Sequence, residues 1–450
     1  MNFAEGPLLG VAERVAHGLS CYPDPRPIPY MINPYGPVAY YLFAGVVKIF
    51  GVNLTAPRIF VGAATIWCAV VISLLVRHWT GSVKVGVAFG SLFLTMPAVL
   101  QWIAMFRVDL IGLAFALTGL LFFVTSNRWF TSVPFFVAAF FCKFTFVAAP
   151  TACVIYFLSK KDWRKSIGFA GLWAGLAGVA FFACQRLTQG WFAFHTILAS
   201  SVHPFAMEVW VEWTLDELNY ALVPFLLTIA LFFRRGPRDF ASLPFIYVVL
   251  ASLSTILRGK LGADSNYYLE WEAALCICLG VKYGQLKTGK ADSDVVRAFV
   301  PFFLGCWILA VTHWINLDND ASLRASRAEC REAYQFVSDH HDNRILTENV
   351  GALVLSGAPP VVFEPFLWGR EVLDGKWSDS EVLDLIRSRS LPLILVDRNV
   401  ERAKSDSYPN LWPREVLESI EQNYALVGGF KCKDANYVYA PQPSLKLLSK

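Results

Sequence analysis

The sequence has few charged residues. Asp, Glu, Lys and Arg make up 16% of its 450 residues, whereas soluble domains average about 25%. This shortage excludes an ordinary soluble domain of this length. The net charge is only +4 and the basic residues concentrate in short loops, so no nucleic-acid partner is predicted.

Three further features are missing. The chain does not begin with a basic segment followed by an apolar core, so it lacks the pattern of a secretory signal peptide. No spacing of Cys and His matches a zinc site, so no cofactor is certain and the question of a divalent metal stays open. No internal repeat of the kind found in many transporters is apparent.

What the chain does have is long apolar stretches. Hydrophobic residues make up 55% of the sequence, with 36 Phe and 15 Trp, as in lipid-facing helices with aromatic residues at the membrane interfaces. The stretches predict ten membrane spans. They cover residues 58–76, 83–105, 109–124, 129–158 (two spans), 167–184, 218–233, 240–257, 268–283 and 296–314.

The polar segments between these spans alternate between two kinds. One kind is basic, at residues 77–78, 127–128, 160–165, 234–238 and 282–290. The other kind mixes acids, amides and single cations, at residues 5–6, 107–109, 143–145, 185–217 and 258–272. Because basic loops stay in the cytoplasm, the mixed segments are predicted on the opposite face. Ionisable residues gathered there indicate a reaction or binding centre.

The apolar segment 129–158 is too long for one span and short for two. Both of its flanks, Arg128 and Lys160, are basic. We therefore expect two short helices that turn at Lys143 on the outer face. The alternative is one long tilted helix with Lys143 buried, which would invert every later loop.

The sequence predicts three regions. Residues 1–57 form a first outer loop with an amphipathic surface helix over Tyr35–Phe50, which ends at Gly51. Residues 58–315 form an all-α polytopic membrane domain, and residues 316–450 form a small soluble α/β domain. The even number of spans places the C-terminal domain and the first loop on the same, outer side of the membrane.

The C-terminal region alternates short β-like runs with helix-like segments. Strands are predicted at residues 344–347, 360–364, 391–396, 424–430 and 437–440, and helices at 378–388 and 413–423. Cys330 and Cys432 both lie in this region. A disulfide between them is compatible with the sequence, although spacing alone does not establish it.

Four motifs lie in the predicted outer segments: Glu5 with Ala12-Glu13-Arg14 after it, Arg107-Val108-Asp109, Lys143-Phe144-Thr145 and Ser265-Asn266-Tyr267. The order of these motifs and their common side resemble those of the multi-spanning bacterial glycosyltransferases of the GT-C fold (glycosyltransferase family 39-like). These are related to protein O-mannosyltransferases and the lipid A aminoarabinose transferase.

The resemblance implies a GT-C-like membrane domain with eleven spans in a full version and a cytoplasmic N-terminus. It also implies a bacterial inner membrane, with the active site and the C-terminal domain on the periplasmic side. The chain departs from the family in two ways. Met1 is close to Glu5, where members usually begin with a span, and Ala4 stands where many members have a second acid. The missing acid raises the alternative of an inactive binding protein.

Sugar transfer from a lipid phosphate to a hydroxyl needs a base near the acceptor, and a carboxylate can serve. It also needs cations that hold the phosphate. Glu5 is the predicted base, and a solvated N-terminal acid is its alternative; Asp24 and Asp109 are the other candidate acids. The candidate phosphate ligands are Arg58, Arg107, Lys143 and Arg258.

Each of these candidates has a structural alternative. The four cations are equally compatible with snorkelling at the membrane interface. Asp24 suits a turn between prolines, and Asp109 suits a plain ion pair with Arg107.

A further set of polar residues is predicted to contact the sugar or the acceptor: Asn266, Tyr267, Glu270, His195 and His203. Helix capping is the alternative for Asn266. His195 and His203, with Glu208 and Glu212 in the same long loop, are also candidates for a divalent metal, but their spacing fits no standard site.

The predicted function is therefore a membrane glycosyltransferase. It would move a hexose or pentose from a polyprenyl phosphate to an envelope glycan or lipid, with inversion. Its partners would be the lipid-linked sugar, that acceptor and the membrane lipid. A polytopic transporter is the main alternative.

Overall fold

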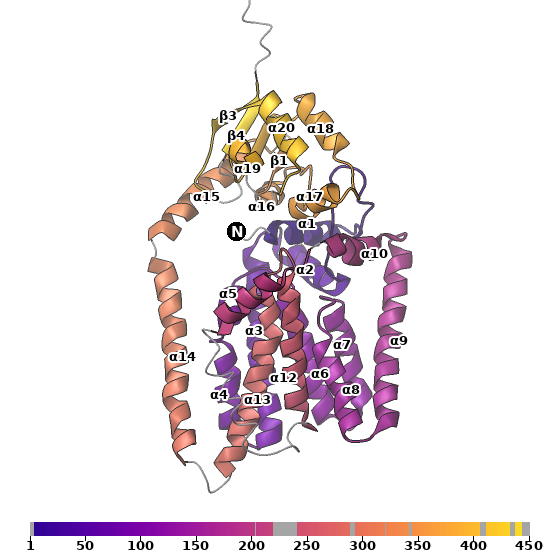
Figure 1. Cartoon of the computed structure of the whole chain (residues 1–450), viewed down its shortest axis with the longest axis vertical. Helices are drawn as coiled ribbons and strands as arrows, with labels where there is room; N and C mark the ends of the chain where they lie inside the picture. Colours follow the sequence, from indigo (N-terminus) through magenta and orange to yellow (C-terminus); the bar gives the residue numbers. More distant parts are fainter. Residues whose placement is uncertain are drawn as a thin grey trace, which may run out of the picture.

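The computed structural model describes residues 4–202, 204–218, 241–288, 293–319, 321–341, 344–405, 411–432 and 437–442. Helices dominate the described part of the chain, and a four-stranded sheet lies near its C-terminal end. The helical bundle and the domain that holds the sheet lie one above the other (Figure 1). The predicted order, an all-α domain followed by a small α/β domain, agrees with this architecture.

The bundle lies between residues 55 and 319. Its helices are α3 (Thr55–Thr80), α4 (Val83–Phe93), α5 (Pro97–Trp102), α6 (Asp109–Thr125), η1 (Trp129–Ser132), α7 (Val133–Phe140), α8 (Ala148–Ser159), α9 (Trp163–Leu187), α10 (Trp191–Ala193), η2 (Phe194–Leu198), η3 (Ala199–Val202), α12 (Leu243–Ser254), η5 (Thr255–Gly259), η6 (Ser265–Tyr268), α13 (Leu269–Thr288) and α14 (Ser293–Asn319). Residues 207–218 are also helical. The predicted span at residues 218–233 lies outside the described residues, except for Leu218.

Two described helices, α3 and α9, are long and apolar enough to cross a membrane. In α9, large apolar side chains such as Ile167, Val179 and Phe182 are exposed. In Figure 1, α9 and α14 stand at opposite edges of the bundle. A long apolar helix that is not buried in protein fits contact with lipid.

Residues 129–158 form the predicted helical hairpin. η1 and α7 lead to a turn that contains Lys143, and α8 returns from it. Trp129 at the start and Phe157 at the end line one cavity, together with Lys160. A single long helix would hold these two ends far apart, so that alternative is wrong.

The same cavity shows where the basic loops lie. His78, Lys165 and Lys282 also line it, and each comes from a segment predicted to be basic. These segments therefore gather at the end of the bundle opposite to the Lys143 turn, as the alternation of loop charge predicts.

The first residues differ from the predicted polar loop. Glu5–Ala16 forms helix α1, which is almost entirely buried, and it packs on α2 and on α16 (Val350–Ser356). A Cβ atom on Gly6 would lie 2.3 Å from the backbone nitrogen of Gly351. Glycine therefore allows α1 to approach the C-terminal domain this closely.

The predicted amphipathic helix is confirmed as α2 (Pro37–Phe50). Pro37 occupies the first turn, and Gly51 ends the helix with φ 74°, a conformation that favours glycine. One face is buried, while Tyr41, Ile49 and Phe50 are exposed. The location of this helix at a membrane surface stays a prediction.

The C-terminal domain contains α15 (Ala321–Asp339), β1 (Ile345–Thr347), α16, α17 (Pro365–Leu373), α18 (Ser380–Arg387), β2 (Leu393–Val396), α19 (Val400–Ser405), α20 (Arg414–Asn423), β3 (Tyr424–Gly428) and β4 (Tyr437–Pro441). The strand order is β1-β2-β4-β3, with β1 parallel to β2 and the other pairs antiparallel. The disulfide between Cys330 and Cys432, which the sequence left open, is present.

The predicted strand at residues 360–364 is wrong. This segment makes only isolated bridges, Tyr30 with Val362 and Ile345 with Pro360. Tyr30 donates its backbone N–H to Val361 O at 3.0 Å and accepts from Phe363 N at 2.8 Å. Tyr30 of the N-terminal segment thus forms two backbone hydrogen bonds with this stretch and links it to the bundle.

Candidate active site

A cavity of about 560 Å³ lies where the bundle meets the C-terminal domain, within the usual range for ligand pockets. We call its bundle side the floor, which includes Tyr35, Arg107, Lys143, Lys260, Asp264, Asn266 and Tyr267. We call its C-terminal-domain side the roof, which includes Glu348, Glu364, Asp397, Arg398 and Trp412.

Asp109 is the centre of an ion network in the floor. It is the first residue of α6 and only 1% exposed. Its Oδ1 accepts hydrogen bonds from Lys143 Nζ at 2.7 Å and from Asn266 Nδ2 at 2.8 Å. Arg107 Nε lies 3.8 Å from its Oδ2. Three segments that are distant in sequence and are predicted to be outer ones therefore meet at one carboxylate, as the shared sidedness of the motifs predicts.

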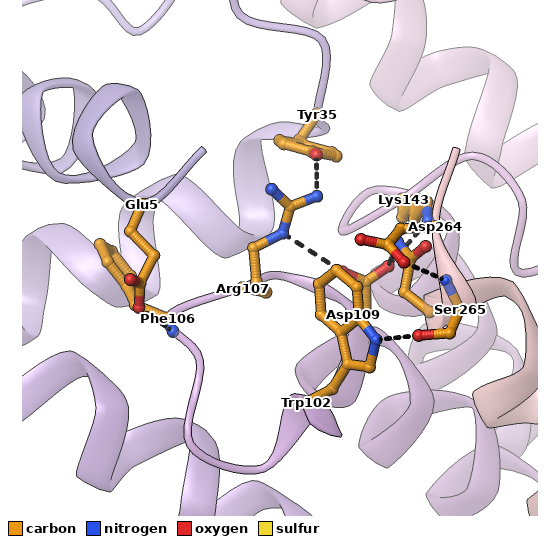
Figure 2. A network of polar contacts seen from close by, with 10 residues as sticks. Glu5, Tyr35, Trp102, Phe106, Arg107, Asp109, Lys143, Asp264 and Ser265 are labelled. Carbon is orange, nitrogen blue, oxygen red and sulfur yellow. Dashed lines mark hydrogen bonds and ion pairs between the residues drawn. The ribbon is translucent and has the colours of Figure 1, made fainter. Parts of the chain in front are cut away.

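Arg107 is held by aromatic rings. Its guanidinium carbon lies 5.6 Å from the centre of the Tyr35 ring and 5.2 Å from that of Trp102. It also donates a hydrogen bond to Tyr35 Oη at 2.7 Å. Figure 2 shows the guanidinium between Tyr35 and Asp109. These contacts fix the direction in which Arg107 presents its charge.

The backbone explains why Tyr35 and Lys143 are neighbours. Gly36 N donates to Cys142 O at 3.2 Å, and Val38 N donates to Phe141 O at 3.1 Å. A Cβ atom on Gly36 would lie 2.0 Å from Phe141 O. Only glycine allows the N-terminal segment to lie directly on the Lys143 turn.

Three buried polar atoms of this network have no hydrogen-bond partner within the described part of the chain. They are Arg107 Nε, Asp109 Oδ2 and Asn266 Oδ1. Buried polar atoms in native proteins are nearly always satisfied by protein, water or a ligand. A cluster of them at the wall of a cavity therefore indicates that a polar ligand or ordered water binds there.

Glu5 is fully buried, so the alternative of a solvated acid is wrong. Arg58 binds its carboxylate through Nε at 2.8 Å and Nη2 at 2.6 Å, and Phe106 N donates to Oε1 at 2.7 Å. Neither Glu5 nor Arg58 lines the cavity. This geometry favours a positioning role for the pair, which holds the backbone next to Arg107, over the predicted roles as base and phosphate ligand.

Asn266 and Tyr267 lie in the floor, and their contact with a sugar or an acceptor stays a prediction. Lys143 Nζ lies 4.0 Å from the centre of the Tyr267 ring, and both residues line the cavity. Asn266 bonds Asp109 and does not cap a helix, since the cap of η6 is Asp264, which accepts from Ser265 N at 2.7 Å.

Two predicted residues lie near the floor but outside the cavity lining. Glu270 is buried in α13 and accepts from Tyr247 Oη at 3.3 Å, so it links two helices instead of facing a sugar. The Arg258 guanidinium carbon lies 4.3 Å from the ring centre of Trp213. Its Nε has no hydrogen-bond partner within the described residues.

His195 has a structural role in place of the predicted acceptor contact. Asn33 N donates to its Nδ1 at 3.1 Å, which leaves Nε2 to donate to Pro23 O at 2.7 Å. Both ring nitrogens are thus used to anchor the N-terminal segment. Burial lowers the pKa of His195 to about 4, which agrees with a neutral ring.

Asp24 lies outside the cavity lining. It binds Arg26 Nε through Oδ1 at 2.9 Å, and this hydrogen bond lowers its pKa. The turn and ion-pair role therefore applies. His203 lies outside the described residues.

Among the residues that the structure describes, no group of three His, Cys, Asp or Glu side chains is placed to hold a metal ion. Glu208 and Glu212 are exposed on the helix at 207–218, and the ring nitrogens of His195 are both engaged. The proposed metal set is therefore not assembled in this part of the chain.

Two acids of the roof, Glu348 and Glu364, differ in their surroundings. Glu348 is buried and accepts from Trp412 Nε1 at 2.7 Å and Asp397 N at 3.1 Å, so it holds the roof together. Glu364 is partly buried and lines the cavity. Burial raises its pKa to about 8, although the charge of Arg107 opposes the shift.

The sequence did not predict Glu364 as a site residue. It lay in a segment expected to be a strand, without a motif around it. Tyr35 and Lys260 were not predicted either. Both nevertheless belong to segments that the sequence analysis singled out, the predicted amphipathic helix Tyr35–Phe50 and the mixed segment 258–272.

The chain matches the model of a family described as dolichyl-phosphate-mannose-protein mannosyltransferase over residues 33–185, about a third of its length. This part holds Tyr35, Arg107, Asp109 and Lys143. No curated protein matches the sequence.

Two solved structures share the fold. ArnT from Cupriavidus metallidurans bound to undecaprenyl phosphate has a TM-score of 0.64 and 13% identity, over 98% of this chain and 94% of that one. The same protein in the apo state has a TM-score of 0.60 and 12% identity, with the same coverage. The predicted resemblance to the GT-C glycosyltransferases is thereby confirmed in fold over nearly the whole chain, and in sequence over residues 33–185.

Proposed function

We propose that this chain, which has the GT-C fold, is a membrane glycosyltransferase that takes a sugar from a polyprenyl phosphate and transfers it, with inversion, to an envelope glycan or lipid. One observation carries the proposal. Arg107 Nε, Asp109 Oδ2 and Asn266 Oδ1 are buried and have no hydrogen-bond partner among the described residues, and Arg107 and Asn266 line the cavity together with Lys143.

The charge of the floor suits a lipid phosphate. Arg107 and Lys143 bring two positive charges, and Asp109 brings one negative charge. One positive charge is left over in a site where the side chains are almost completely buried. A phosphate would balance it and would accept charge-assisted hydrogen bonds. Asp109 keeps the two cations together while the site is empty.

The same cations suit the chemistry. When the bond between the sugar C1 and the phosphate oxygen breaks, the lipid phosphate leaves with additional negative charge. Fixed donors that face this charge stabilise the transition state, so no acid is needed at the leaving group. A single displacement by the acceptor would invert the anomeric carbon. Asn266 and Tyr267, next to Lys143, are placed to contact the sugar.

The arrangement of charges supports an outer location for the cavity. The basic loops lie at the opposite end of the bundle, which is the cytoplasmic end by the positive-inside rule. The Cys330–Cys432 disulfide belongs to the domain that forms the roof, and disulfides persist in oxidising compartments such as the periplasm.

Purified protein in proteoliposomes tests the proposal. We expect wild type to bind undecaprenyl phosphate and to release it from a donor in a panel that includes undecaprenyl-phosphate mannose and aminoarabinose. Lys143→Ala should weaken binding by about 10–100-fold, since a charge-assisted contact contributes roughly 1.5–3 kcal/mol.

Lys48→Ala is the matched control, because Lys48 is exposed on α2. If Lys143→Ala bound undecaprenyl phosphate as tightly as wild type, the floor would not be the donor-binding site. Transport of the sugar lipid across the membrane without cleavage would instead favour the transporter.

A further inference from the structure

We propose that Glu364, in the roof, is the general base of this reaction, and that the acceptor nucleophile is a neutral hydroxyl and not a phosphate. This inference rests on the proposed function. It deepens that function by naming the catalytic acid and the class of acceptor.

The position of Glu364 is the first argument. It is the residue before α17 and lines the same cavity as Arg107 and Lys143, but from the opposite domain. A donor phosphate on the floor would leave the acceptor to approach from the roof. A displacement with inversion requires this arrangement, because the nucleophile must attack C1 on the face opposite to the leaving group.

The freedom of its carboxylate is the second argument. Within the described part of the chain, Glu364 makes no side-chain hydrogen bond or ion pair, and it does not cap α17. Other acids of the site are engaged: Asp264 by Ser265 N, Glu348 by Trp412, and Asp109, next to the cavity, by Lys143. Asp397 is not free either. A base must have a lone pair available to the proton that it removes.

Its backbone is nevertheless fixed. Phe363 N donates to Tyr30 O at 2.8 Å, and Tyr30 N donates to Val361 O at 3.0 Å. The ring of Tyr30 stacks on Trp368, and its hydroxyl donates to Glu381 Oε2 at 3.0 Å. The segment that carries Tyr35 to the floor therefore also holds Glu364 in the roof, so the two halves of the site are positioned by one stretch of chain.

The reaction balances without a further reagent. The acceptor oxygen forms a bond to C1 as the bond between C1 and the phosphate oxygen breaks. The hydroxyl proton passes to Glu364 and later to water, while the lipid phosphate leaves on Arg107 and Lys143. A phosphate acceptor would already be ionised, would need no base, and would be repelled by the carboxylate of Glu364.

The raised pKa of Glu364, about 8, supports this role, since a carboxylate with a raised pKa is a stronger base. Only the deprotonated form accepts the proton, so turnover should rise with pH through about 8 and then level off. Among the described residues, the charge of Arg107 acts on this titration, and Tyr40 is a second titratable group that interacts with Glu364.

The test compares Glu364→Gln with wild type in the proteoliposome assay. We expect turnover to fall by about 10²–10⁴-fold, the usual contribution of a positioned base, and the basic rise of the pH profile to disappear. Affinity for undecaprenyl phosphate should stay within about threefold, because the floor is unchanged. Glu364→Asp should recover part of the turnover.

Glu415→Gln is the matched control, because Glu415 is exposed on α20. Near-normal turnover by Glu364→Gln, or faster turnover with a phosphate acceptor than with a hydroxyl, would overturn this inference and leave the proposed function intact. Wild type that binds undecaprenyl phosphate but releases it from no donor would overturn both.

Discussion

The floor and the roof of the cavity differ in charge and in origin. The floor comes from helix ends of the bundle, and two of its cations, Arg107 and Lys143, flank one buried acid, Asp109. The roof comes from the C-terminal domain and contributes three acids and one cation, Glu348, Glu364, Asp397 and Arg398. This difference agrees with the two roles proposed above. The floor holds the leaving phosphate, and the roof activates the nucleophile.

The largest expected effect is in the floor. Asp109→Asn removes the acid between Lys143 and Arg107 and leaves two buried cations without compensation. Breaking a buried ion pair from one side costs about 3–5 kcal/mol, so thermal unfolding in detergent should shift strongly downward and transfer should be lost. Asp216→Asn, at an exposed site on the helix at 207–218, is the control.

A double variant sharpens this result. Asp109→Asn combined with Lys143→Met removes one charge of each sign, so stability should recover in part while undecaprenyl phosphate binding stays weak. Recovery of both properties would show that Lys143 serves only as a counter-ion for Asp109, and the floor would then lose its role in binding.

Removing the disulfide would alter only the C-terminal domain, which forms the roof. Cys330 and Cys432 are 102 residues apart, and closing a loop of this length stabilises a domain by roughly 2–4 kcal/mol. Replacing both with Ser should lower the unfolding temperature of the C-terminal domain and reduce transfer. Undecaprenyl phosphate binding should persist. If binding fell together with transfer, the floor and the roof would not act separately.

A smaller effect concerns the pH dependence of stability. It arises from His195, which anchors the N-terminal segment that joins the floor and the roof. The folded pKa of His195, about 4, is depressed below the unfolded value of about 6.5. Between these values the unfolded chain binds a proton that the folded chain does not, so stability is lost as pH falls from about 6.5 towards 4. Unfolding temperatures across this range should decrease less in His195→Gln, and an equal decrease would assign the effect to other groups.

Much of the floor could be predicted from sequence because membrane topology is a strong constraint. Once the basic loops define one side, Arg107, Asp109, Lys143 and Asn266 must lie at the same ends of their helices. Helical packing then brings Lys143 and Asn266 within hydrogen-bonding distance of Asp109, with Arg107 beside it. The hairpin at residues 129–158 followed from the same rule.

The roof and the N-terminal segment could not be predicted in this way. Glu364 reaches the cavity only because Tyr30 binds the backbone on either side of Val362, a contact between residues more than three hundred positions apart. The burial of α1 depends on the close approach of Gly6 to Gly351. His195 was chosen for its chemistry, but its two ring nitrogens serve Asn33 and Pro23. Such pairings arise from tertiary packing, which no local pattern encodes.

The most direct measurement is an experimental structure of the protein with undecaprenyl phosphate bound. The account predicts a phosphate on the floor, within about 3 Å of Lys143 Nζ and of an Arg107 nitrogen, with the carboxylate of Glu364 facing it across the cavity. A phosphate bound among His78, Lys165 and Lys282 at the basic end of the bundle, with the floor occupied only by water, would contradict it.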